Sequence, residues 1–142
     1  MPKAIASLAD QYQNRPVRVE VAPVATTAER VEQFATFVRA GDKQSLLTIT
    51  LQDKSVSRAL IFTRTKHGAD KVVRSLEKSG LRAAAIHGNK SQPQREKALE
   101  AFRAGRTPFL VATDIAARGL DIDDVSHVIN YEVPNVPEQY VH

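Results

Sequence analysis

Short, uninterrupted apolar runs alternate with helical patterns along most of the chain, and this alternation limits the possible folds more than any other feature. Residues 59–62 (ALIF) and 109–112 (FLVA) have the length and composition of strands that are covered on both faces. Residues 17–21, 82–86 and 125–130 predict three more strands. The pattern is typical of an α/β fold, in which a parallel sheet carries helices on both faces.

Helices are predicted between these strands. Residues 41–52 form one helical pattern, and residues 66–79 form a second one that ends before a glycine. Ser91 and Gln94 have the spacing of a capping box, so we expect a third helix to begin there and to end at Gly105. The buried face of this third helix is predicted to hold Ala98, Leu99 and Phe102.

The segment 31–39 fits two patterns. Its apolar residues could lie on one face of a helix or on a strand, because a short segment does not separate the two periods. Its valine and phenylalanine content favours a strand, which we expect here.

Charge is unevenly distributed along the chain, although the net charge is only +4. Residues 54–106 hold thirteen basic and four acidic side chains, whereas residues 107–142 hold one basic and six acidic side chains. A basic block of this size indicates a polyanionic partner, with RNA or DNA as the first candidates. The alternative on charge alone is a solvated Lys/Arg surface on two helices.

Length and composition exclude several classes of protein. A chain of 142 residues suits one domain with a core that needs no metal or disulfide. It has no cysteine, which excludes a disulfide scaffold, a cysteine nucleophile and thiolate metal sites. No apolar run reaches membrane-spanning length, and His67, His87 and His127 lack metal-ligand spacing. We therefore expect no metal site and no membrane partner, and the absence of cysteine fits a cytoplasmic location.

Four segments should meet at one edge of the sheet, because the carboxyl ends of parallel strands lie together and bind ligands there. Residues 63–66 and 87–91 precede helices. The free N–H groups and the positive ends of these helices favour phosphate oxygens. Gly88 would let a phosphate approach the backbone closely, while Arg64, Lys66 and Lys90 add full charges. This predicts a track for a sugar-phosphate backbone rather than a reader of base edges. The four segments are 63–66, 87–91, 113–119 and 130–134.

The residues alone predict no complete catalytic machinery. The phosphate-binding pattern Gly-x-x-x-x-Gly-Lys-Ser/Thr is absent, and so is the dinucleotide pattern Gly-x-Gly-x-x-Gly of a dehydrogenase half. Asp114 and Arg118 are four residues apart and could form an ordinary surface ion pair. Gln92 and Arg95 share one face at a helix start, where capping and solvation are the ordinary explanation.

Four motifs resemble those of DEAD-box RNA helicases, which are ATP-dependent enzymes that remodel RNA duplexes. Residues 112–122 (ATDIAARGLDI) resemble motif V over eleven consecutive positions. Residues 58–66 (RALIFTRTK) resemble motif IV, and residues 86–95 (IHGNKSQPQR) resemble the His-Gly turn and the Gln-x-x-Arg motif. Residues 127–142 resemble the segment that enters motif VI, with Glu132 where the family often has Asp. The resemblance implies the C-terminal RecA-like domain of such an enzyme, of a bacterial RhlE-like type.

The resemblance also implies an incomplete domain. Motif VI of the family continues His-Arg-x-Gly-Arg-x-Gly-Arg, and His142 matches its first position. The arginines that reach the ATP phosphates, and the last strand and helix of the fold, would then be missing. Residues 1–16 would be the tail of the first domain or a linker, and residues 17–142 the incomplete C-terminal RecA-like domain. The isolated chain is expected neither to hydrolyse ATP nor to unwind RNA.

A role for each matching position follows from the resemblance. Asp121 would hydrogen-bond the nucleotide ribose. Asp114 and Arg118 would pair and join the RNA and ATP sites, and His142 would couple motif VI to the first domain. The residues that would contact or orient the RNA backbone are Arg64, Gly88, Gln92, Arg95 and Thr113.

The family's activity further implies cofactors and partners. ATP with Mg²⁺ would bind the full-length enzyme, whereas none is expected on this chain alone. RNA and the N-terminal RecA-like domain of the same protein would be the partners. A homodimer of the truncated chain could cover a sheet edge or an apolar face that the missing strand and helix would expose. The alternative function is a non-catalytic, sequence-independent RNA-binding or dimerising module.

Overall fold

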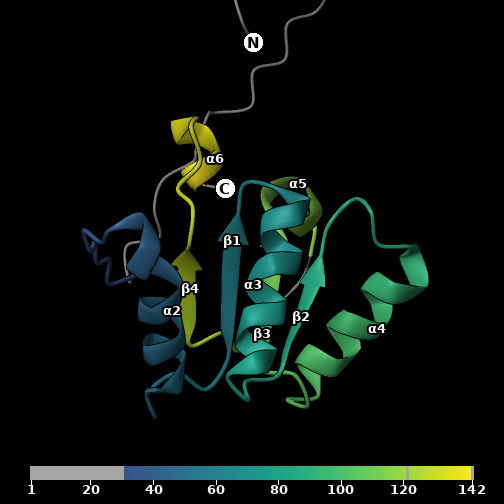
Figure 1. Cartoon of the computed structure of the whole chain (residues 1–142). Helices are drawn as coiled ribbons and strands as arrows, with labels where there is room; N and C mark the ends of the chain where they lie inside the picture. The colour runs from purple at the N-terminus through teal and green to yellow at the C-terminus, as the bar shows by residue number, and fades with distance from the viewer. Residues whose placement is uncertain (1–30, 121, 142) are drawn as a thin grey trace, which may run out of the picture.

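Strands and helices alternate along the chain in the computed structural model, which describes residues 31–120 and 122–141 (Figure 1). The strand predicted at residues 17–21 and the segment 1–16 lie outside the described residues. The elements are η1 (Ala40–Asp42), α2 (Lys43–Gln52), β1 (Ala59–Thr63), α3 (Lys66–Lys78), β2 (Ala83–Ile86), α4 (Gln92–Arg103), β3 (Phe109–Thr113), α5 (Asp114–Ala117), β4 (His127–Asn130) and α6 (Pro137–Val141).

The four strands form one sheet in the order β2-β3-β1-β4, and every neighbouring pair is parallel. β3 and β1 lie in the middle, which explains why their sequences are continuous apolar runs. β2 and β4 are the outer strands of this four-stranded sheet. The predicted parallel α/β sheet is therefore confirmed.

The core lies on both faces of the sheet. Side chains alternate along each strand, so that Ile61 and Val111 pack on one face beneath α2 and α3. Leu110 and Ile86 pack on the other face, where Phe102 of α4 is fully buried against them. The prediction of helices on both faces is confirmed by these two clusters.

Helix boundaries follow the capping signals in the sequence. The Ser91 hydroxyl accepts from the Gln94 N–H, and the Gln94 side chain accepts from the Ser91 N–H, which completes the predicted capping box of α4. Gly80 and Gly105 follow α3 and α4 with φ of 78° and 70°, a left-handed conformation that glycine adopts without steric cost. Within the described part of the chain, no helix is long and apolar enough to cross a membrane.

The strand predicted at residues 31–39 is wrong. This segment has no regular structure, and all of its side chains are exposed, including Phe34 and Phe37. A strand forms only where a neighbouring strand pairs with its N–H and C=O groups, and β4 pairs with β1 alone among the described residues. Valine and phenylalanine content therefore misled the prediction, because β-propensity depends on tertiary context.

Candidate phosphate-binding edge of the sheet

The carboxyl ends of the four strands meet at one edge. Thr63 at the end of β1 is paired with Thr113 at the end of β3, and Ile86 at the end of β2 is paired with Ala112. Phe62 is paired with Asn130 at the end of β4. Figure 1 shows the arrowheads of β1, β2 and β4 at this edge, with α5 and α6 beside it. The predicted convergence of four segments is confirmed, and we call this side of the sheet the carboxyl edge.

Arg64 is held at the carboxyl edge by the loop that follows β4. Its backbone N–H donates to Glu132 Oε2 at 2.9 Å, and its Nη1 donates to Asn135 Oδ1 at 3.1 Å. Its Nη2 lies 3.8 Å from Glu132 Oε1. The Arg64 side chain remains half exposed, so that Glu132 fixes the place of Arg64 without burying the whole side chain.

The start of α3 is directed at the same edge. Thr65 is the N-cap, and its hydroxyl accepts from the Gly68 N–H at 3.0 Å. A Cβ at Gly68 would lie 2.9 Å from the Thr65 hydroxyl, so a larger residue there would require the hydroxyl or the helix start to shift. Lys66 Nζ donates to Asn89 Oδ1 at 2.9 Å and thereby links the start of α3 to the loop after β2.

The loop after β2 is a tight turn. The Lys90 N–H donates to the His87 carbonyl at 2.9 Å, which leaves Gly88 and Asn89 exposed at the tip. A Cβ at Gly88 would meet nothing within 4 Å, so the space above this glycine is open. Open space beside a cationic turn fits the predicted approach of a phosphate to Gly88.

A buried histidine lies beneath this turn. His87 is only 2% exposed, and its Nε2 lies 2.9 Å from Asp70 Oδ1 on α3. Lys90 Nζ lies 3.1 Å from the same carboxylate oxygen. Burial by itself raises the pKa of Asp70, but the hydrogen bonds from His87 and Lys90 outweigh it and hold that pKa below its ordinary value. Asp70 was not predicted as a site residue, since nothing in the sequence indicates that it faces His87.

Gln92 and Arg95 lie three residues apart on α4 and have different hydrogen-bond partners. Gln92 is exposed on α4, and its Nε2 donates to Glu96 Oε1 at 2.9 Å within the same helix. Arg95 reaches across to α5, where its Nη2 donates to the Ala116 carbonyl at 3.4 Å. Arg95 therefore links α4 to the segment after β3, whereas Gln92 faces solvent.

The predicted pairing of Asp114 with Arg118 is confirmed. Arg118 Nη2 lies 3.1 Å from Asp114 Oδ2 across one turn of α5. Thr113 ends β3 and precedes this turn, and its hydroxyl makes no capping hydrogen bond to α5. Asp121 and His142 lie outside the described residues, so their predicted roles have no structural counterpart here.

Metal ligands are not gathered at the carboxyl edge. Among residues 31–120 and 122–141, no three His, Cys, Asp or Glu side chains lie where they could hold a metal ion. Two acidic side chains near the edge contact other residues of the edge, since Glu132 contacts Arg64 and Asp70 contacts His87. The cationic side chains of the edge are Arg64, Lys66 and Lys90.

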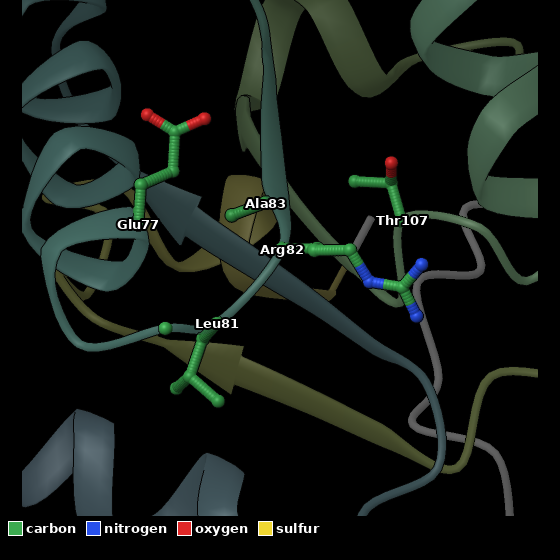
Figure 2. A pocket seen from close by; sticks show the side chains of 6 residues that line it. Glu77, Leu81, Arg82, Ala83 and Thr107 are labelled. Atoms are coloured by element: carbon green, nitrogen blue, oxygen red, sulfur yellow. The ribbon is translucent and has the colours of Figure 1, made fainter.

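A shallow depression of about 350 Å³ lies on the opposite side of the sheet (Figure 2). It is formed where α3 ends and where β2 and β3 begin, and Figure 2 shows the Arg82 side chain extending toward Thr107. We call this side of the sheet, where β2 and β3 begin, the amino edge. None of the predicted site residues lines the depression. The lining residues are Glu77, Gly80, Leu81, Arg82, Ala83 and Thr107.

Comparisons with known proteins agree with this geometry. The helicase conserved C-terminal domain model matches residues 41–142. DEAD-box ATP-dependent RNA helicase 21 of Oryza sativa subsp. japonica is 41% identical over 142 residues, which are 100% of this chain and 19% of that relative. The chain thus spans about one fifth of the length of this curated relative.

Solved structures show the same fold. A DEAD box protein from Methanococcus jannaschii is 33% identical with a TM-score of 0.72, covering 99% of this chain and 38% of that one. Prp28 from Chaetomium thermophilum, bound to ADP, is 34% identical with a TM-score of 0.67, covering 100% of this chain and 34% of that one. The predicted RecA-like helicase fold is confirmed. The chain therefore belongs to the helicase conserved C-terminal domain family, as a C-terminal domain of the DEAD-box kind.

Proposed function

We propose that the carboxyl edge binds the sugar-phosphate backbone of RNA and contributes one wall of the cleft of an ATP-dependent DEAD-box RNA helicase. The observation that carries this proposal is the convergence of Arg64, Lys66 and the exposed turn at Gly88 on one edge of a parallel sheet. Arg64 is ready to meet a phosphate because Glu132 and Asn135 already fix its position.

Within this function, Thr113 and Arg95 are proposed to act from the segment after β3. Thr113 lies beside the end of β1, close in the sheet to the Arg64 loop, and its hydroxyl is free of a capping role. Arg95 holds the Ala116 carbonyl, so its proposed role is to orient this segment rather than to contact RNA alone. Gln92 is proposed to reach RNA from the exposed face of α4.

The nucleotide part of the function is proposed from the relatives. The rice relative is named as ATP-dependent, and the Prp28 structure contains ADP. Asp121 and His142 would face the ribose and the first domain, and the Asp114–Arg118 pair would connect that side to the RNA side. ATP with Mg²⁺ is the proposed nucleotide of the full-length enzyme.

The physical logic of such a cleft is electrostatic. Phosphoryl transfer is accelerated by cations that are positioned where negative charge develops. A domain that binds both RNA and nucleotide on one edge would couple the two events. When the cleft closes on RNA, arginines would be positioned near the phosphates of the nucleotide. The RhlE-like type, the cytoplasmic location and the boundary at residue 16 are proposals that rest on the motifs and the composition alone.

Dimerisation is a second candidate function. β4 is an outer strand, and Val128 on it is exposed, as are Phe34 and Phe37 in the preceding irregular segment. An exposed strand edge with apolar side chains favours pairing with another chain. A single monomeric mass in light scattering across a hundredfold range of protein concentration would contradict this second candidate.

The proposed RNA binding is expected to be independent of sequence. Two fluorescent single-stranded RNAs of equal length and unrelated sequence should bind the chain with dissociation constants within about threefold, because phosphate contacts carry no base information. Fluorescence anisotropy at low salt measures both constants. No binding of either RNA would contradict the proposal, and a strong preference for one sequence would contradict the backbone track.

A further inference from the structure

We propose that Asp70 and His87 are positioning residues that hold the turn at residues 87–90 in the shape that receives a phosphate. This inference rests on the proposed RNA binding. It adds a positioning role for the contact between Asp70 and His87, which the matching motifs do not assign. Neither side chain would touch RNA. His87 is buried beneath the turn, and Asp70 lies behind it on α3.

Two hydrogen bonds determine the tautomer of the His87 ring. The Asn89 N–H donates to His87 Nδ1 at 3.3 Å, which requires a lone pair on that nitrogen. The ring proton of the neutral form is then on Nε2, from which it is donated to Asp70 Oδ1 at 2.9 Å. Asp70 therefore selects the one neutral tautomer that leaves Nδ1 able to accept from the turn.

The turn is fastened to α3 at three points. The Asp70 carboxylate receives His87 Nε2 and Lys90 Nζ, and Lys66 Nζ donates to Asn89 Oδ1. Gly88, at the tip of the turn, has open space where a Cβ would lie. A loop that is ordered before its ligand arrives loses less conformational entropy on binding, which strengthens the complex.

Two possible effects of the Asp70 carboxylate, repulsion of a phosphate and positioning of the turn, predict opposite changes in RNA affinity when Asp70 is removed. Asp70 is an anion near a proposed phosphate site, so its removal would strengthen RNA binding if charge repulsion were its main effect. If Asp70 positions the turn, its removal weakens binding because His87 loses the acceptor that fixes its tautomer. The depressed pKa of Asp70 is consistent with a carboxylate that remains ionised in this role.

The binding experiment compares three variants with the wild-type chain by RNA anisotropy. We expect Asp70→Ala to weaken RNA binding roughly tenfold, because the buried His87 ring loses its hydrogen-bond acceptor. Asp70→Asn keeps an oxygen that accepts from Nε2 and should stay within about threefold of the wild type. Glu77→Ala is the matched control, because it removes one carboxylate from α3 at the amino edge (Figure 2) and should not weaken binding.

A readout on the ring itself does not depend on RNA. Long-range ¹H–¹⁵N spectra of the wild-type chain should show His87 protonated at Nε2 and not at Nδ1. In Asp70→Ala, the single tautomer should be lost and the Asn89 amide should exchange faster with solvent. An Nδ1-protonated ring in the wild type would overturn the inference without any variant.

The outcomes separate this inference from the proposed function. If the wild type binds no RNA, the proposed function fails and the inference falls with it. If the wild type binds RNA and Asp70→Ala binds it equally well or more tightly, only the positioning inference is overturned. Tenfold weaker binding by Asp70→Ala, with recovery in Asp70→Asn, supports both.

Discussion

Phe102→Ala is expected to lower the free energy of unfolding by about 3–5 kcal/mol. Phe102 is 0% exposed and packs with Leu110 and Ile86 between α4 and the sheet. Its ring also lies 5.9 Å from the Arg58 guanidinium, a cation–π distance. Since domains of this size are stable by roughly 5–15 kcal/mol, the substitution would remove a large part of the stability.

The same substitution at Phe37 is the control. Phe37 is fully exposed in the irregular segment before α2, so Phe37→Ala should change the free energy of unfolding by less than about 0.5 kcal/mol. Urea unfolding followed by circular dichroism measures both values. Equal effects of the two substitutions would contradict the assignment of Phe102 to the core and of Phe37 to the surface.

RNA affinity is expected to fall roughly a hundredfold for each tenfold rise in monovalent salt. Each cation that neutralises a phosphate of a single strand contributes about −0.7 to the slope of log K against log salt, because counterions are released. The carboxyl edge offers Arg64, Lys66 and Lys90, and three such contacts predict a slope of about −2. Anisotropy titrations at four or more salt concentrations measure this slope.

Single substitutions identify the cationic side chains that produce the salt dependence of RNA affinity. Arg64→Ala and Lys90→Ala should each make the slope shallower by about 0.7. Arg82→Ala and Arg106→Ala, which remove charge near the amino edge, should leave it unchanged. A salt-independent affinity, or equal losses from both edges, would contradict a phosphate track at the carboxyl edge and favour a diffuse basic surface.

Much of the fold was predictable because its signals are local. The apolar runs of β1 and β3 identify central strands without knowledge of their neighbours. The Ser91–Gln94 capping box defines the start of α4 within four residues. Once the strands are known to be parallel, the handedness of their connections places Arg64 and Gly88 on one edge.

The failures concern contacts between distant residues. Residues 31–39 have strand-like composition, but their structure depends on whether another strand lies beside them. The partner of His87 is Asp70, seventeen residues earlier on another element, and no spacing rule connects them. The contact of Arg95 with the Ala116 carbonyl across α4 and α5 likewise follows from no spacing rule.

Chemical-shift mapping tests the central claim most directly. A ¹H–¹⁵N spectrum of the chain, titrated with short single-stranded RNA at low salt, follows each backbone amide. The account predicts that the largest shifts fall on Arg64, Gly88 and Thr113 at the carboxyl edge, and that Leu81 and Thr107 at the amino edge do not move. Shifts centred on the amino edge, or spread evenly over the basic helices, would contradict it.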